Sequence, residues 1–198
     1  STLLGMVLLQ SSCCGLLGCN KVFAGDITIE NKAEYDSFTA SKISGEESDG
    51  KVNGNTITIN DLNKTGLVVD KVVRGAYGNN KIVSDNKVHV DGGTFNSMLY
   101  GGNAFNEGAV NNSIEIVSGE FNNNIYGAYV NGYKGGDLEG NSVYIINGDF
   151  TVKNIGTVPK GIIGGHNEGA SNSANVKSNS VTIDNGTFGK DVNIYGGY

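Results

Sequence analysis

The side chains best suited to chemistry in this sequence are a histidine and a glutamate that occupy matching positions in neighbouring repeats. His89 and Glu115 are each the third residue after the asparagine that opens a repeat. A fold that stacks the repeats would bring the imidazole beside the carboxylate, and such a pair can act as general acid and base. The other repeats hold different residue types there, so we expect a solvated outward column and no catalytic role. The full column is Thr58, His89, Glu115, Tyr144 and Thr182.

Two further carboxylates, Glu120 and Asp149, also occupy matching positions of neighbouring repeats. Paired carboxylates in a cleft are what glycoside hydrolysis requires. The other repeats carry Thr94 and Thr187 at this position, which indicates ordinary variation on a polar surface. His166 belongs to a column of mostly tyrosines, so we expect it to stack or to stabilise a turn. That column consists of Tyr77, Asn103, Tyr129, His166 and Tyr198.

Charge, composition and motifs exclude several classes of protein. The net charge is −6, and lysine and arginine form no cluster that could neutralise phosphates, so we expect no nucleic-acid partner. The segment Gly135–Gly140 resembles a calcium-binding repeat only loosely, and the sequence lacks the Gly-x-Ser-x-Gly nucleophile elbow. No apolar stretch reaches the ~18 residues of a membrane-spanning helix. We predict no catalytic residue, no cofactor and no metal site.

The elements that position these side chains are copies of one phrase, Asn-x-Val-x-Ile-x-x-Gly-x-Phe. Its alternating apolar residues are typical of a half-buried strand, and its glycine marks a bend. A second phrase follows each copy, an apolar residue before Gly-Gly or Gly-Ala, as in Ile194-Tyr-Gly-Gly197. Identical strands would pair in parallel with their own copies at about 4.8 Å per coil. The sequence therefore predicts an all-β solenoid of about five imperfect coils over residues 55–198.

Stacking of the coils aligns like residues in columns. We expect the turn asparagines to form a ladder of amide hydrogen bonds, and they are Asn55, Asn86, Asn112, Asn141 and Asn179. A stack of phenylalanines is expected in the core, comprising Phe95, Phe121, Phe150 and Phe188. The asparagines are separated by 31, 26, 29 and 38 residues, which predicts inserted loops on one side of the solenoid.

Tyrosines of the second phrase form a candidate exposed aromatic stripe. Tyr100, Tyr126 and Tyr195 each follow an inward apolar residue, so alternation predicts that they point outward. Tyrosine is a frequent binding residue because it offers a large contact area and a hydroxyl group at low entropic cost. The alternative is that the rings stack on one another and stabilise the wall of the solenoid.

The N-terminal segment resembles an export signal. Residues 3–9 are almost entirely apolar, and small or branched residues favour signal peptidase cleavage after Ala24. Alternatively, Leu16-Leu17-Gly18-Cys19 resembles a lipobox in which Cys19 takes a diacylglycerol. All three cysteines precede residue 24, so cleavage there leaves no thiol for a disulfide or a metal. We expect an export signal over 1–24, a first strand and capping segment over 25–54, and a repeat domain over 55–198 that is a fragment of a longer chain.

The pair of phrases Asn-Ser-Val-x-Ile-x-x-Gly-x-Phe and Ile-Tyr-Gly-Gly, behind an export signal, resembles the passenger regions of bacterial type V autotransporters and related adhesins. The resemblance covers residues 52–198. It implies a right-handed parallel β-helix that is displayed on the Gram-negative cell surface or shed from it. It also implies a C-terminal translocator barrel in the full protein.

These observations favour a non-enzymatic β-solenoid for adhesion or surface display. The expected partner is a host or cell-surface protein or a glycan, and the expected location is the cell surface, the outer membrane or the medium. Two alternatives remain open at this point. One is a polysaccharide-acting β-helix enzyme, and the other is a surface lipoprotein anchored through Cys19 with the solenoid as a spacer.

Overall fold

The computed structural model describes residues 26–45, 52–151, 161–169 and 174–198. The expected export signal over 1–24, with the candidate processing sites Cys19 and Ala24, lies outside these residues. Within the described part of the chain, no helix has the length and apolar character needed to cross a membrane.

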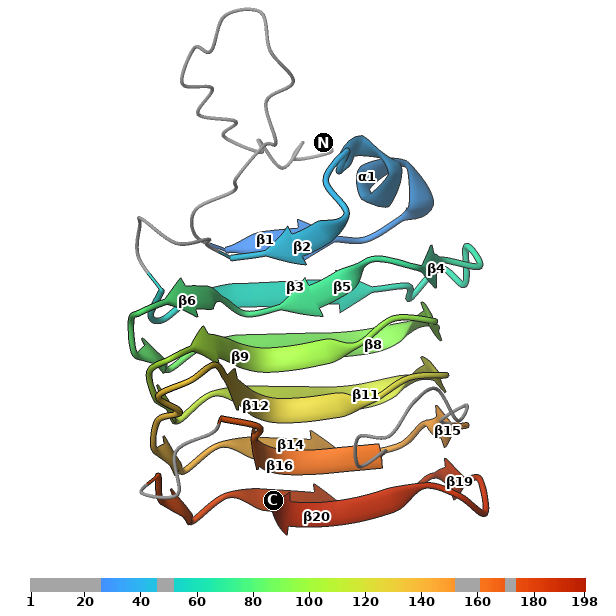
Figure 1. Ribbon diagram of the computed structural model, residues 1–198. Helices are drawn as coiled ribbons and strands as arrows, with labels where there is room; N and C mark the ends of the chain where they lie inside the picture. Colours follow the sequence, from blue (N-terminus) through green and yellow to red (C-terminus); the bar gives the residue numbers. More distant parts are fainter. Residues whose placement is uncertain (1–25, 46–51, 152–160, 170–173) are drawn as a thin grey trace, which may run out of the picture.

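The chain winds into a β-solenoid of about five turns in which every strand pairs in parallel with its copy in the next coil (Figure 1). The strands form three sheets, here named A, B and C. Sheet A contains β1 (Ile27–Ile29), β3 (Thr56–Asn60), β4 (Val68–Val69), β8 (Lys87–Phe95), β11 (Ser113–Phe121), β14 (Ser142–Ile145), β15 (Asp149–Phe150), β18 (Ser180–Ile183) and β19 (Thr187–Phe188). Sheet B contains β2 (Lys42–Ser44), β5 (Val72–Arg74), β6 (Tyr77–Asn79), β9 (Leu99–Phe105), β12 (Ile125–Asn131), β16 (Gly161–Asn167) and β20 (Asn193–Gly197). Sheet C contains β7 (Val83–Ser84), β10 (Ala109–Val110), β13 (Leu138–Glu139) and β17 (Val176–Lys177). The parallel pairing in all three sheets confirms the predicted all-β solenoid.

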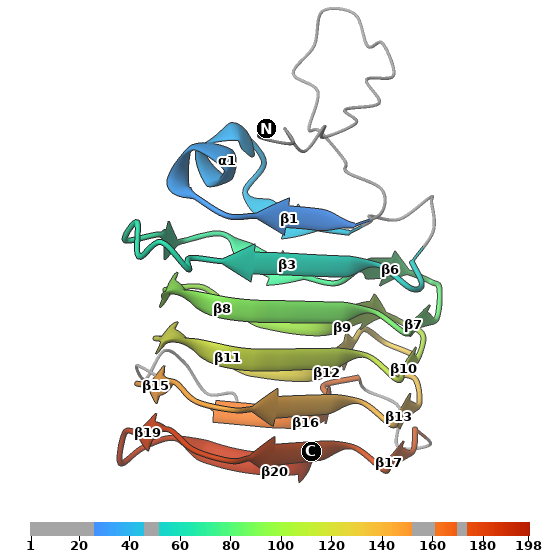
Figure 2. The same cartoon turned by 180° about the vertical axis from the view of Figure 1, so that it is seen from behind.

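The main core lies between sheets A and B, which form opposite sides of the solenoid (Figures 1 and 2). In sheet A the aliphatic side chains alternate inward and align between coils, as Ile114 does with Val88 and Val143. The phenylalanines form the predicted stack, with ring centroids 4.9 to 5.0 Å apart and near-parallel planes. Because each residue packs on its own copy, no single repeat could bury this core alone.

The asparagines that precede the strands of sheet A form a buried amide ladder. The Nδ2 atom of Asn112 donates to Oδ1 of Asn141 at 3.0 Å and to the carbonyl oxygen of Val83 at 2.9 Å. In return, Oδ1 of Asn112 accepts from both Nδ2 and the backbone N–H of Asn86, at 2.8 and 3.2 Å. The amide thus uses both of its hydrogens and both acceptor sites, which is how a buried polar group avoids a desolvation cost.

The N-terminal segment adds a coil that the repeat pattern does not reveal. β1 pairs with β3 and β2 pairs with β5, although residues 33–50 copy no repeat phrase. Between these strands lies the helix α1 (Lys32–Ser37), capped by Asn31, whose Oδ1 accepts from the N–H of Glu34 at 3.0 Å. The buried ring of Tyr35 packs into the core, and its hydroxyl accepts from the N–H of Asp70 at 2.8 Å. The helix is thereby fixed at the N-terminal end of the stack (Figure 1).

The extra residues of the longer coils do not lie on one side, contrary to the prediction. The strand register places them between β3 and β4, between β15 and β16, and at the corner from sheet B to sheet C, both between β12 and β13 and between β16 and β17. Residues 152–160 and 170–173 of these insertions lie outside the described residues. The insertions interrupt three different corners because only the strand segments need to stay in register with the neighbouring coil.

Candidate functional site

The predicted pair of His89 and Glu115 meets on the outer face of sheet A, the face turned to the viewer in Figure 2. Nδ1 of His89 lies 3.1 Å from Oε2 of Glu115, and Nζ of Lys87 lies 2.5 Å from the same oxygen. The hydrogen bond from Lys87, and then that with His89, hold the pKa of Glu115 below its ordinary value. A carboxylate kept ionised in this way is a poor proton donor and a weak base. The arrangement is an ion-paired surface cluster.

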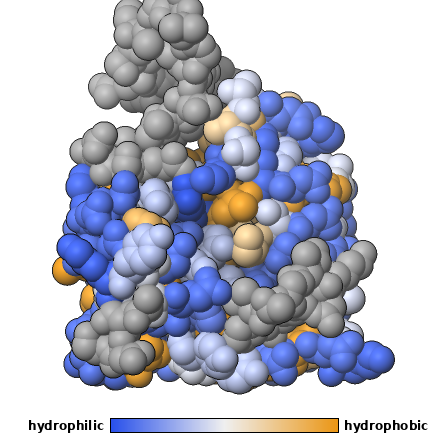
Figure 3. Space-filling model, viewed as in Figure 1, coloured by the Kyte–Doolittle hydropathy of each residue, from blue (hydrophilic) through white to orange (hydrophobic). Residues whose placement is uncertain are grey.

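The candidate tyrosines do not form an exposed stripe, and the alternative expectation, that their rings stack on one another, holds for Tyr100 and Tyr126. Tyr100 is only 6% exposed and Tyr126 only 2%, while Tyr195 is partly buried. Tyr100 and Tyr126 stack with ring centroids 5.2 Å apart, and the ring of Tyr129 packs at an angle against both, at 5.6 and 5.3 Å. The column of Tyr100 and Tyr126 and the column of Tyr129, both on the outer side of sheet B, therefore pack against one another. Figure 3 shows this side of the molecule as mainly hydrophilic, with scattered apolar residues at the surface.

Glycines lie in the chain between the two columns of rings. A Cβ atom at Gly101 would lie 2.3 Å from the carbonyl oxygen of Gly127, and one at Gly127 would lie 2.3 Å from that of Gly164. Only glycine therefore fits this position against the backbone of the next coil. Because the strand takes an irregular step at these glycines, residues three positions apart, such as Tyr126 and Tyr129, reach the same side and touch. We call the resulting cluster the aromatic layer, comprising Tyr100, Tyr126, Tyr129, Ile163, His166, Tyr195 and Tyr198.

His166 takes the stacking position expected from its column. Its ring lies parallel to those of Tyr129 and Tyr198, with centroids 5.4 and 5.2 Å away. The side chain is 1% exposed, and neither ring nitrogen has a hydrogen-bond partner within the described part of the chain. Burial lowers the pKa of this imidazole, and the carboxylate of Glu168 partly opposes the effect.

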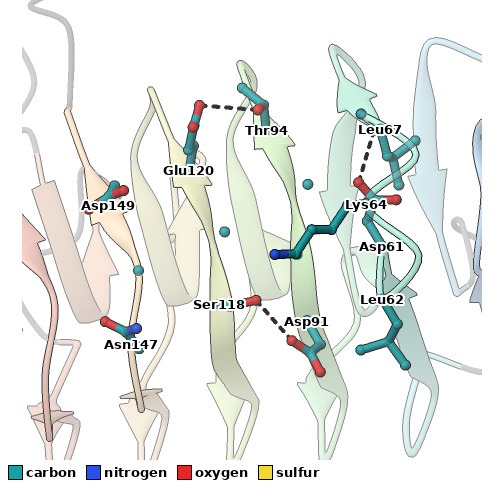
Figure 4. A pocket seen from close by; sticks show the side chains of 15 residues that line it. Asp61, Leu62, Lys64, Leu67, Asp91, Thr94, Ser118, Glu120, Asn147 and Asp149 are labelled. Carbon is teal, nitrogen blue, oxygen red and sulfur yellow. Dashed lines mark hydrogen bonds between the residues drawn. The ribbon is translucent and has the colours of Figure 1, made fainter.

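A polar groove runs along the edge where the strands of sheet A turn towards sheet B (Figure 4). It encloses about 470 Å³ and crosses four coils. Glycines lie between two rows of polar side chains, and Ser118 donates to Asp91 across neighbouring coils at 2.9 Å, as Thr94 does to Glu120 at 3.2 Å. We call this feature the edge groove. The polar side chains of its two rows are Asp91, Ser118, Asn147, Thr94, Glu120 and Asp149.

The loop between β3 and β4 closes one end of the edge groove. Asp61, at its start, is 6% exposed and accepts hydrogen bonds from the N–H and hydroxyl of Thr65 and from the N–H of Leu67. Burial alone would raise the pKa of Asp61, but these hydrogen bonds outweigh it and hold the pKa below its ordinary value. The ionised carboxylate fixes the loop so that Lys64 extends into the groove (Figure 4). Lys64 forms no ion pair with any described residue.

The carboxylates of the edge groove come from different coils and do not converge. Among residues 26–45, 52–151, 161–169 and 174–198, no three His, Cys, Asp or Glu side chains come close enough to hold a metal ion. No protein-family model, curated protein or solved structure matches this chain.

Sequence reasoning missed the edge groove although it assigned three of its residues to one column, Thr94, Glu120 and Asp149. Glu120 and Asp149 do pair in register, together with Thr94 and Thr187. The missing signal was the long interval between Asn55 and Asn86. That interval contains the loop that turns an open polar surface into a groove.

Proposed function

We propose that this chain is a non-enzymatic β-solenoid of the autotransporter-passenger or adhesin type, exported to the cell surface or the medium, where it binds a partner along its side. The observation that best supports binding is the edge groove, a continuous polar surface built by equivalent residues of successive coils. A ligand can engage several coils there at once.

The state of the ionisable residues favours a scaffold over an enzyme. Glu115 is bound by Lys87 and His89 on an outer sheet face. His166 is enclosed in the aromatic layer, away from any substrate. An enzyme needs an acid or base that can reach the substrate and change protonation state. Glu115 and His166 are instead committed to the wall of the solenoid.

The export part of the proposal is tested by locating the protein in cells that produce it. We expect an antibody against the chain to label intact cells or to detect the protein in the medium, and we expect surface protease treatment to remove the cell-bound signal. N-terminal sequencing should show a chain that begins at Gly25. Retention in the cytosol would contradict export, and fatty-acid labelling that is lost in Cys19→Ser would instead establish a lipoprotein.

The non-enzymatic part is tested by incubating the purified chain with a panel of soluble polysaccharides. We expect no release of reducing ends and no unsaturated products at any protein concentration. Sustained cleavage of one polysaccharide, abolished by Glu120→Thr or Asp149→Thr, would replace the scaffold by a polysaccharide-acting enzyme.

A further inference from the structure

The edge groove presents polar groups at each coil that it crosses. On one side are Asp91, Ser118 and Asn147, and on the other side Glu120 and Asp149 continue the second row. Successive coils are about 4.8 Å apart, so these groups of three coils span about 10 Å along the axis, and the loop of the fourth coil extends the groove to about 14 Å. A ligand that uses several of them must be an extended chain lying parallel to the solenoid axis.

The charges of the groove point to hydroxyl groups as the matching chemistry. Asp91 and Glu120 already accept hydrogen bonds from the hydroxyls of Ser118 and Thr94, so the walls themselves are built from carboxylate–hydroxyl pairs. The carboxylates repel a polyanion, while the ammonium group of Lys64 stands where a basic peptide would have to place its own charges (Figure 4). A hydroxyl both donates and accepts, and it can therefore pair with either kind of group.

The base of the groove suits a flat ring. Gly93, Gly119 and Gly148 line it between the two polar rows. Gly93 and Gly119 have φ values of 92° and 138°, so a side chain at either position would be strained, and the surface stays free of side chains. At the closed end Leu62 is 66% exposed. It offers apolar surface to the C–H face of a sugar ring.

We propose that the edge groove binds an uncharged, hydroxyl-rich oligosaccharide along the solenoid axis, with about one sugar for each coil step. The carboxylates of Asp91, Glu120 and Asp149 accept hydrogen bonds from its hydroxyls, and Lys64 donates to it at the closed end. The inference rests on the proposed function, since only a solenoid displayed outside the cell meets such a glycan.

The test measures binding of the purified chain to cellotriose, chitotriose, maltotriose and mannotriose, with heparin oligosaccharide and oligolysine as charged comparators. The double variant Glu120→Thr/Asp149→Thr replaces both carboxylates by threonine. Threonine already occupies this column at Thr94 and Thr187, so the variant should fold as the unmodified chain does. We expect at least one neutral trisaccharide to bind. We also expect the double variant and Lys64→Ala each to weaken that binding by about tenfold or more, as the loss of charged hydrogen bonds implies.

A matched control removes a carboxylate from another face. Glu115→Thr makes the same chemical change on the outer face of sheet A, where Thr58 and Thr182 share its column, and it should bind as the unmodified chain does. Circular dichroism melts establish that all variants are folded. The inference is overturned if none of the four trisaccharides binds, if heparin or oligolysine binds more tightly, or if the double variant retains full affinity. Export and the lack of polysaccharide cleavage are measured separately, so the proposed function survives each of these results.

Discussion

The buried imidazole of His166 makes the stability of the C-terminal coils depend on pH. Burial lowers its pKa, and the carboxylate of Glu168 only partly offsets this. The other ionisable groups that face it are the phenols of Tyr126, Tyr129 and Tyr198, which stay neutral in acid. The folded-state pKa thus lies below the value of about 6.5 for an unfolded histidine. Below that pH the unfolded chain binds a proton that the folded chain does not, so the free energy of unfolding decreases as the pH falls.

The pH dependence of the free energy of unfolding is limited because His166 binds only one proton. The slope cannot exceed about 1.4 kcal/mol per pH unit, so lowering the pH from about 6.5 to about 5.5 should reduce the free energy of unfolding by at most about 1 kcal/mol. For a chain of this size that limit corresponds to a decrease in Tm of about 2–4 °C. His166→Tyr introduces the residue that flanks it on both sides, at Tyr129 and Tyr198. The variant should keep the stacked rings and lose the titrating group.

Thermal melts by circular dichroism across this pH range provide the assay. The sequence contains two histidines, so His89→Thr, which copies Thr58 and Thr182 of its own column, is the matched control. We expect the acid-induced decrease in Tm to persist in His89→Thr and to vanish in His166→Tyr. Ordinary carboxylates titrate near pH 4 and contribute little in this window. The reasoning would be refuted by a decrease of equal size in His166→Tyr, or by an unmodified chain whose Tm does not change.

Three further substitutions probe the wall of the solenoid, each measured by urea unfolding. Asn112→Ala should destabilise the chain by about 3 kcal/mol, because it leaves buried donors of the amide ladder without an acceptor; a loss below that of an exposed substitution would contradict the ladder. Phe121→Ala, in the middle of the stack, should cost about 3–5 kcal/mol, and more than Phe188→Ala at the partly buried end. Gly127→Ala should be severely destabilising, since its Cβ would meet a carbonyl oxygen at 2.3 Å, whereas Gly196→Ala in the last coil meets its nearest atom at 3.0 Å and should be milder. Equal effects of the two glycine substitutions would show that the close approach is not the cause.

The parallel sheets, the phenylalanine stack and the asparagine ladder could be predicted because each depends on a residue meeting its own copy. Once the period is known, the partner of Asn112 is fixed as Asn141 without any knowledge of the path between them. The same holds for Phe121 and Phe150. Contacts between equivalent positions are therefore determined by the alignment of the repeats alone.

Contacts between different positions of the coil could not be predicted in this way. Alternation assigns Tyr126 to the outside correctly, but it does not show that the irregular step at the glycines turns Tyr129 towards it and helps to bury Tyr126. The helix α1 and the loop that Asp61 holds over the edge groove belong to single coils. Neither has a copy to align with, and their placement follows from local caps and hydrogen bonds.

The same physical distinction identifies where a function can lie. An inward residue that changes in one coil loses its contact with two neighbours, so the asparagine, phenylalanine and glycine columns must stay uniform for the stack to form. An outward residue touches solvent and can change at little cost. Glu120 and Asp149 replace the threonines found at Thr94 and Thr187 of the same outward column, at the edge groove, where the replacement adds charge without disturbing the core. His166 departs from a tyrosine column inside a closed layer, where an unpartnered imidazole is unfavourable. The first departure is suited to recognising a ligand and the second to sensing acid, and the column-matched substitutions separate the two.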